Sequence, residues 1–509
     1  MKRFLLLLLP AMPAHAATAA RPAAALGVAA LYFLFCVAVA WRHRQKQARL
    51  RAAGTAREGA LLVAYASQTG YAEQLAAQTA QSLEAAGVAV ALRPLGGLDA
   101  AALAGHRRAL FVVSTTGEGD APDTVAGFAR RTMAAPPRLD GLEYGVLALG
   151  DASYAQFCAF GRALDQWLRH AGAAPLFDRV EVDNGDAAAL RHWQQQLSAL
   201  AGHAEIADWR APDYQPWRLV ERQLLNPGSV GEPVYRVALA PPAPGVAWQA
   251  GDVAEIGPRH APAALDAWLR ACGVDADAAM RDALADRLLP SPQPLGAAAL
   301  ATLRDSLPPL PHREYSIASL PGDGVLELVV RQQRRSDGAL GLGSGWLTRD
   351  AAVGDAIALR IRENKGFHPP ADDCPLILIG NGTGIAGLRA QLKAWRAAGR
   401  RGAWLLFGER NAAHDALFGD EIAGWLADGL LARADLVYSR DGAAREYVQH
   451  RLRAELPRLR QWLARGAALY VCGSREGMGQ GVDAVLREAL GDDAVDGLTQ
   501  DGRYRRDVY

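Results

Sequence analysis

Short apolar runs alternate with amphipathic stretches in the part of the chain that follows residue 59. The runs include LLVAY, ALFVVST and GVLALGD, and the stretches between them include AEQLAAQTAQSLEAAG and AFGRALDQWLRHAG. Apolar residues recur at helical spacing in these stretches, whereas the runs have the length of buried strands. The pattern predicts a parallel sheet flanked by helices over residues 59–204. Residues 205–220 lack it and are expected to be a linker.

The pattern changes in the middle of the chain. ERQLLNPGSVGEPVYRVALAPP and WQAGDVAEIGP alternate with period two, which predicts antiparallel strands over residues 221–370. Residues 258–308 are instead rich in alanine and are predicted to be a helical insertion, after which strands resume at REYSIASLP and VLELVVRQQ. Apolar runs and helical stretches alternate again over residues 371–509, which predicts a second α/β domain.

The amino terminus carries two apolar segments. Residues 1–16, MKRFLLLLLPAMPAHA, have the basic start, apolar core and Ala-x-Ala end of a signal peptide, although an uncleaved leader or a misassigned start remains an alternative. Residues 23–41 carry no charge and are long enough for one membrane crossing, which we expect in preference to a buried core helix. Arginine and lysine crowd residues 42–57, so the positive-inside rule predicts a single-pass protein of the inner or plasma membrane with its catalytic domains in the cytoplasm.

Composition excludes several classes of site. The net charge is +1 and basic residues are not gathered in one block, so nucleic-acid binding is not expected. The five cysteines lie far apart, without a C-x-x-C pair or a histidine at ligand spacing, which argues against a disulfide framework, an iron–sulfur cluster or any other metal site. Redox chemistry would then require an organic cofactor.

Three polar loops follow predicted parallel strands, where ligands bind in such sheets. They are SQTGYAE (67–73), STTGEGDAPD (114–123) and LGDASYAQFC (149–158). The first loop could simply cap the helix that comes after it, or its hydroxyls and amides could bind a phosphate at that helix terminus. It has no G-K-[ST] sequence, so a phosphate bound there would belong to a cofactor that is held intact.

In this order and spacing, the three loops resemble the flavodoxin-like FMN domain of NADPH-dependent diflavin reductases. The resemblance implies a phosphate site and a ring site for FMN. The phosphate site comprises Ser67, Gln68, Thr69, Gly70, Tyr71 and Ala72, and the ring site comprises Thr115, Thr116, Gly117, Gly119, Gly150, Asp151, Tyr154, Phe157 and Cys158. Tyr154 is expected to stack on the flavin. Tyr71 stands where the family commonly has Thr or Asn.

The segment REYSIAS places Arg313, Tyr315 and Ser316 on one extended stretch. Arg can pair with a diphosphate, Tyr can stack on a flavin and Ser can bond its reactive edge, although a plain barrel strand could carry the same residues. GLGSGWL adds Gly341, Gly343 and Ser344 at a predicted helix start. Together these segments resemble the FAD-binding barrel of the ferredoxin reductase family, which assigns residues 221–370 to FAD.

A glycine loop follows the first predicted strand of the last domain. Gly382, Gly384 and Gly387 form a G-x-G-x-x-G, which is a weak motif alone. The loop resembles the Gly-x-Gly-Thr-Gly-Ile-Ala loop of the same family, so Gly382, Thr383 and Gly384 are expected to contact NADPH. The family usually has Pro, Pro and Phe where this chain has Asn381, Gly387 and Leu388, and we expect a more flexible loop from these departures.

Further along, the segment YSRDGAAREYVQ indicates the choice of nucleotide. It supplies hydroxyl and cationic groups suited to a 2′-phosphate, and a solvated charged loop is the alternative. The candidate contacts are Ser439, Arg440, Arg445, Tyr447 and Gln449. Arg445 stands where the family typically has Lys. NADPH is therefore predicted in preference to NADH.

The segments YVCGSREGMG and GRYRRDVY complete the resemblance, which is greatest to flavoprotein subunits of NADPH-sulfite reductases. It implies that Cys472 lies beside the nicotinamide, that Asp507 lies near the hydride path and that Tyr509 covers the FAD ring. With Ser316, these residues form the predicted catalytic set.

The family resemblance implies electron flow from NADPH to FAD, then to FMN, then to a one-electron acceptor. Three hypotheses address the acceptor and the role of the chain. In the first, the acceptor is a hemoprotein or a sulfite reductase haem subunit. In the second, it is a ferric chelate or a membrane electron-transfer partner. In the third, the chain is a flavin-binding scaffold without catalysis.

Overall fold

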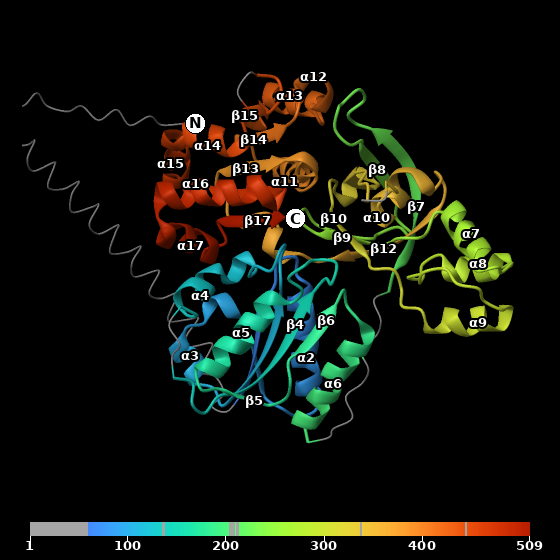
Figure 1. The fold of residues 1–509 in the computed structure, drawn as a ribbon. Helices are drawn as coiled ribbons and strands as arrows, with labels where there is room; N and C mark the ends of the chain where they lie inside the picture. The colour runs from blue at the N-terminus through green and yellow to red at the C-terminus, as the bar shows by residue number, and fades with distance from the viewer. Residues whose placement is uncertain (1–59, 135–137, 203–208, 210–212, 336–337, 443–444) are drawn as a thin grey trace, which may run out of the picture. The chain divides into compact units, whose positions relative to one another are not determined.

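The computed structural model describes residues 60–509 except 135–137, 203–208, 210–212, 336–337 and 443–444. The expected signal peptide (1–16) and membrane span (23–41) lie outside the described residues. Among the helices that are described, none combines the length and the apolarity needed to cross a bilayer. Three sheets, each formed by one continuous stretch of chain, organise the described part (Figure 1).

The first sheet is parallel, with strand order β2-β1-β3-β4-β5 and with β6 also paired to β4. Its strands are β1 (Leu61–Ala66), β2 (Val90–Pro94), β3 (Arg108–Ser114), β4 (Glu143–Gly150), β5 (Ala174–Pro175) and β6 (Val180–Asp183). Its helices are α2 (Tyr71–Ala85), α3 (Ala100–Ala104), α4 (Ala126–Arg131), α5 (Ala159–His170) and α6 (Ala187–Leu200). This is the flavodoxin-like arrangement that the sequence predicted.

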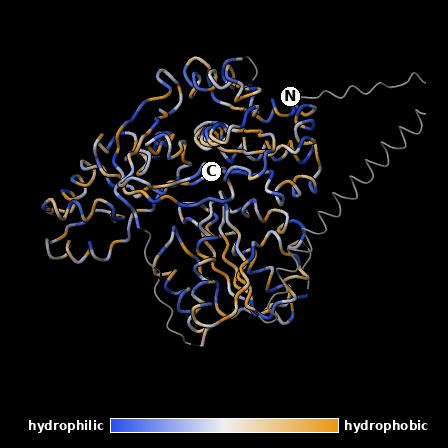
Figure 2. The backbone as a smooth tube through the Cα atoms, turned by 180° about the vertical axis from the view of Figure 1, so that it is seen from behind, coloured by the Kyte–Doolittle hydropathy of each residue, from blue (hydrophilic) through white to orange (hydrophobic). Residues whose placement is uncertain are grey.

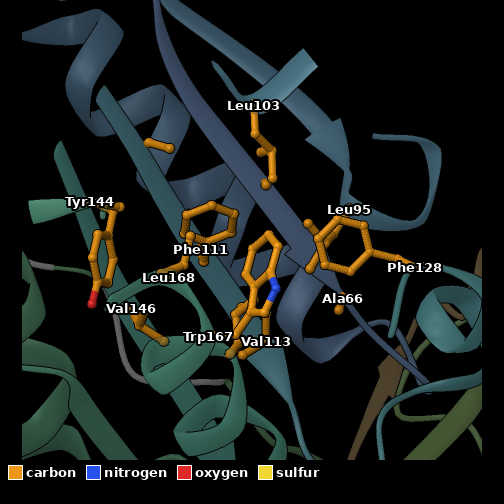
Figure 3. Packing of buried hydrophobic residues seen from close by; sticks show 14 of the residues in the cluster. Ala66, Leu95, Leu103, Phe111, Val113, Phe128, Tyr144, Val146, Trp167 and Leu168 are labelled. Carbon is orange, nitrogen blue, oxygen red and sulfur yellow. The ribbon is translucent and has the colours of Figure 1, made fainter. Parts of the chain in front are cut away.

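Two hydrophobic clusters pack on the two faces of this sheet. Figure 3 shows part of one cluster, in which Phe111 of β3, Trp167 of α5 and Phe128 of α4 lie close together. Trp167 meets Phe128 edge to face at a centroid distance of 5.7 Å. The opposite cluster holds α2 and α6 through Leu75 and Trp193. In Figure 2 the apolar colour runs along the strands of this sheet. Burial of each such large side chain stabilises the fold by about 1.5–3 kcal/mol. This packing holds the helices on the sheet, and with them the loops at the ends of the strands.

The second sheet is antiparallel, with strand order β10-β9-β12-β7-β8-β11. Its strands are β7 (Gln215–Leu224), β8 (Val234–Ala240), β9 (Val253–Gly257), β10 (Arg313–Ser316), β11 (Leu326–Arg331) and β12 (Ala356–Arg362). An antiparallel bridge between Ile317 and Leu328 joins the segment after β10 to β11, so the two edges meet and the sheet closes on itself. We call this junction the barrel seam.

Two further features of this region concern its boundaries. Strand β7 begins at Gln215, inside the span 205–220 that was expected as a linker. The range expected to be a helical insertion contains α7 (Pro262–Ala271), α8 (Ala278–Leu284) and α9 (Ala297–Ser306), which share a hydrophobic cluster of their own. The short helix α10 (Leu342–Gly345) follows β11.

The third sheet is parallel, with strand order β15-β14-β13-β16-β17. Its strands are β13 (Leu376–Asn381), β14 (Ala403–Glu409), β15 (Leu431–Tyr438), β16 (Ala468–Gly473) and β17 (Tyr504–Val508). The helices around it are α11 (Ile385–Ala397), α12 (Ala412–Asp415), α13 (Gly419–Ala427), α14 (Val448–Ala454), α15 (Leu456–Ala464), α16 (Gln480–Leu490) and α17 (Asp492–Gln500). Buried clusters cover both faces, so its central strands β13, β14 and β16 are largely apolar.

Candidate functional site

The loop between β1 and α2 has donors suited to an anion. Gly70 adopts a left-handed φ of 89°, and its N–H donates to the Ser67 hydroxyl at 2.9 Å. No side chain caps the first turn of α2, so its backbone N–H groups and the positive end of the helix dipole remain available for an anion. The residues present therefore fit a phosphate group.

Two side chains at this turn, those of Gln68 and Tyr71, face other parts of the protein. The Gln68 amide donates to the Asp123 carboxylate and to the Arg506 carbonyl, each at 3.0 Å, while its oxygen accepts from the Asp123 N–H at 2.9 Å. Burial, and then the Glu255 carboxylate, raises the pKa of Tyr71 to about 12, so its hydroxyl stays neutral. Gln68 thus connects to the second loop and to β17, which the sequence did not reveal.

The loops that follow β3 and β4 lie beside the loop between β1 and α2, because β1, β3 and β4 are neighbours with parallel directions. The Thr116 hydroxyl donates to the Asp120 carbonyl at 3.2 Å, and Gly117 and Gly119 have left-handed φ values of 48° and 116°. Thr115 accepts from the Phe160 N–H at 3.3 Å. The structure therefore brings all three predicted loops to one edge of the sheet.

The loop after β4 presents an exposed aromatic ring. Tyr154 is 48% exposed, whereas Cys158 is fully buried and adopts a left-handed φ of 54°. The Asp151 carboxylate accepts from the N–H and hydroxyl of Ser153 at 2.8 and 2.5 Å. A side chain at Gly150 would come within 2.9 Å of the Phe157 ring, so glycine is required for this turn to pack. An exposed ring on a rigid turn is suited to stacking on a flat ligand.

The two segments expected at the FAD diphosphate meet in the barrel. A Cβ on Gly343 would lie 2.5 Å from Cγ of Arg313 and 3.2 Å from the Tyr315 hydroxyl, so this glycine packs directly on β10. The Ser344 hydroxyl accepts from the Gln333 N–H at 3.0 Å, and a Cβ on Gly341 would lie 3.0 Å from that hydroxyl. These residues, which are distant in sequence, thus form a glycine-lined surface beside a cation, suited to a diphosphate.

The predicted catalytic residues converge from three elements. Ser316 of β10 donates to the Asp507 carboxylate of β17 at 2.6 Å, and the Cys472 sulfur of β16 lies 3.7 Å from the same oxygen. All three are buried. Burial raises the pKa of Asp507, while burial and then the neighbouring Asp507 charge raise the pKa of Cys472, so its thiol stays protonated. The group can orient a reactant and stabilise positive charge, and it contains no nucleophilic thiolate.

The glycine loop after β13 borders this group. The Tyr509 hydroxyl donates to the Thr383 hydroxyl at 3.0 Å, and a side chain at Gly384 would overlap the Cys472 carbonyl. Asn381 accepts from the Ser474 N–H at 2.9 Å and donates to the Ser474 hydroxyl at 3.1 Å. Gly387 and Leu388 lie buried within α11. The three departures from the family sequence therefore lie in hydrogen-bonded or helically packed positions, and the greater flexibility expected of the loop stays a prediction.

The candidate 2′-phosphate residues lie at the end of β15 and the start of α14. The Ser439 N–H donates to the Glu409 carbonyl at 2.9 Å, whereas the side chains of Arg440, Arg445 and Tyr447 are exposed. The side-chain oxygen of Gln449 is buried and has no hydrogen-bond partner among the residues that the structure describes. Exposed cations beside a hydroxyl at a strand end remain suited to a phosphate.

Three potential metal ligands, Glu255, His312 and Glu314, lie within 4.8 Å of one another, and sequence spacing did not reveal them. Arg362 contacts both carboxylates at 2.6 Å, and Arg360 contacts Glu255 at 2.5 Å. Although burial opposes ionisation, Arg362 lowers the pKa of Glu314 to about 2. Two guanidinium groups thus already neutralise the carboxylates, and the cluster fits an ion-pair network rather than a metal ion.

Comparison with known proteins agrees with this architecture. The flavodoxin family model matches residues 63–193, and the oxidoreductase NAD-binding domain model matches residues 378–484. A sulfite reductase [NADPH] flavoprotein alpha-component from Neisseria meningitidis serogroup A is 30% identical, aligned over 89% of this chain and 90% of the relative. The sulfite reductase [NADPH] flavoprotein alpha-component of Vibrio cholerae is 29% identical over 89% of this chain and 88% of the relative. That of Aliivibrio fischeri is 28% identical over 89% of each chain.

A flavodoxin-like sheet followed by a reductase module with an NAD-binding domain defines the NADPH-dependent diflavin reductases. Within that class, the chain belongs to the sulfite reductase flavoprotein alpha-component family. It is an NADPH-dependent oxidoreductase with FMN and FAD as its flavins.

Proposed function

We propose that this chain oxidises NADPH at the Ser316–Cys472–Asp507 group and delivers single electrons to a haem-containing partner of the sulfite reductase type. The observation that carries the proposal is the convergence of these residues from β10, β16 and β17. When bound, FAD would supply the acceptor for the hydride of NADPH, and FMN would supply the release of its electrons one at a time. The protein supplies binding, orientation and charge.

At the barrel, Arg313 and the glycine surface of residues 341–344 would hold the FAD diphosphate, with Tyr315 against the ring. Ser316 would bond the reactive edge of the ring, and the Asp507 carboxylate would stabilise the positive charge that develops on the nicotinamide as hydride leaves. Tyr509 would cover the ring until nicotinamide replaces it. Residues 382–384 would contact the nucleotide, and residues 439–449 would supply the contacts to its 2′-phosphate.

In the first sheet, residues 67–72 would hold the FMN phosphate through backbone N–H groups and hydroxyls. Residues 115–119 and 150–158 would border the ring, with Tyr154 stacked on it. The exposure of Tyr154 supports this role, because a stacking residue at the flavin edge must remain accessible to both the ring and an acceptor.

The full chain, purified in detergent, provides the test. We expect equal FMN and FAD contents and NADPH-dependent reduction of a sulfite reductase haem subunit. Gly70→Ala should lose FMN and haem reduction while retaining FAD, because a Cβ there would lie 2.6 Å from the Glu363 carbonyl. Gly87→Ala is the matched control, since Gly87 has a similar φ of 83° but open space around it. Equal FMN loss in both variants would contradict the phosphate assignment.

A second acceptor is favoured by the amino-terminal sequence. We propose that residues 23–41 anchor the chain in the inner or plasma membrane, with the sheets on the cytoplasmic side, where a ferric chelate or a membrane carrier is an alternative acceptor. Membrane fractions washed with carbonate should retain the full chain and release a variant lacking residues 1–57. Ferric citrate reduced much faster than the haem subunit would favour the alternative acceptor.

A further inference from the structure

Arg389 forms a buried, multiply bonded charge contact between α11 and the barrel. Its side chain is 4% exposed. One terminal nitrogen donates to the Ala318 carbonyl at 2.9 Å and also to the Glu327 carboxylate of β11. Its remaining nitrogens bind both oxygens of Glu421, on α13, at 2.8 and 2.7 Å. A planar guanidinium is fitted to such forked contacts, because its donors have fixed directions.

The barrel partners of Arg389 lie at the barrel seam. The Ala318 N–H donates to the Glu327 carbonyl at 2.8 Å, immediately beside the bridge between Ile317 and Leu328 that closes the sheet. Ala318 is also only two residues beyond Ser316. Arg389 therefore binds the backbone of the segment that carries the predicted flavin contact.

The other end of the connection is the first turn of α11. A Cβ on Gly387 would lie 3.0 Å from the Cys472 sulfur and 3.7 Å from Cβ of Ser316, so the backbone of this turn packs closely against both residues. Gly387 is two residues before Arg389 on the same helix. A displacement of Arg389 along the barrel would move Gly387 with it and so change how α11 packs against Ser316 and Cys472.

We propose that Arg389 is a positioning residue for hydride transfer, which fixes the helix bearing the nucleotide loop at a set distance from the strand bearing Ser316. This inference rests on the proposed function of the Ser316–Cys472–Asp507 group. Arg389 contacts no reacting atom, and its effect passes through Ala318 and Gly387. Since misplacement of reacting groups by about 1 Å can slow a reaction about 100-fold, a single forked side chain can have a large kinetic effect.

The test compares Arg389→Lys with Lys393→Met in the full chain with both flavins bound. Lys can keep the charge opposite Glu327 but cannot form the fork to Glu421 and Ala318. Lys393 lies one turn further along α11 and pairs with Asp323 at 2.8 Å on the exposed side, so it reports the loss of an ordinary helix-to-barrel contact. Wild-type reduction of FAD by NADPH first establishes the function on which the comparison depends.

Arg389→Lys should slow FAD reduction by about 10- to 100-fold. FAD content and the KM for NADPH should stay within about twofold, and the primary isotope effect with 4-deuterated NADPH should change. Lys393→Met should keep the wild-type rate and isotope effect. A rate loss that merely follows FAD loss, or an unchanged isotope effect, would overturn the proposal. Glu421→Gln, which alters the fork and keeps Arg389, should give a smaller change in the same direction.

Discussion

Replacement of Ser316 by alanine tests the core of the proposed hydride-transfer site. The Ser316 hydroxyl donates to the Asp507 carboxylate at 2.6 Å, and both residues are buried. A hydrogen bond to a charged group contributes about 1.5–3 kcal/mol, which corresponds to a rate loss of about 10- to 100-fold if the carboxylate acts in the transition state. Because this bond holds the pKa of Asp507 down against burial, its loss should raise that pKa further.

Anaerobic stopped-flow reduction of FAD by NADPH over a pH series measures both effects. The proposed mechanism needs the Asp507 carboxylate, so the rate should fall as pH drops through the pKa of Asp507, and this acidic limb should lie at higher pH in Ser316→Ala. Ser319→Ala is the matched control, since the Ser319 hydroxyl is also buried but donates to the Val325 carbonyl at 2.9 Å. An unmoved acidic limb in Ser316→Ala, or the same movement in Ser319→Ala, would refute the reasoning.

Three further outcomes are expected. Gly384→Ala should raise the KM for NADPH and lower the free energy of unfolding by about 1–3 kcal/mol, because the added Cβ would overlap the Cys472 backbone. Steady-state kinetics and calorimetry measure these changes, and an unaltered melting temperature would contradict the close approach of Gly384 to Cys472. The double variant Arg440→Ala, Arg445→Ala should lose much of the preference for NADPH over NADH, measured as the ratio of the two kcat/KM values. An unchanged ratio would indicate that these arginines belong to a solvated loop without a role in nucleotide choice. Asp507→Asn should slow hydride transfer and raise the melting temperature at pH 7, where the buried carboxylate destabilises the fold because burial raises the pKa of Asp507 above the ordinary 3.8. The gain in melting temperature should vanish below pH 3.8, where the carboxyl is protonated in the unfolded chain as well. An equal gain at both pH values would rule out this cause.

Local pattern was sufficient for most strands of the sheets, because these strands are buried on both faces or alternate with period two. LLVAY became β1, and the amphipathic stretch after it became α2. Strand order within the first and third sheets then placed the loops of Ser67, Thr115 and Gly384 at strand ends, as expected of parallel sheets.

Long-range ion pairs could not be predicted in this way. The sequence does not distinguish a buried, paired arginine from an exposed one at positions 362 and 389. The carboxylate partners of Arg362 and Arg389 lie on other elements. Sequence periodicity indicates which face of a helix is buried but not which distant charge it meets. The contribution of β17 was likewise known only from the family resemblance, because GRYRRDVY has no apolar run.

The pairing of Ser316 with Asp507 has a consequence for biosynthesis. The two residues are 191 positions apart, whereas the first sheet is built from one continuous earlier segment. At about 5–20 residues per second, the ribosome needs about 10–40 s to make the chain between them. The flavodoxin-like part can therefore fold while the ribosome is still extending the chain, but the reductase site has no carboxylate during that interval. A nascent chain can thus form the loop proposed to bind phosphate well before the proposed site of nucleotide oxidation is complete.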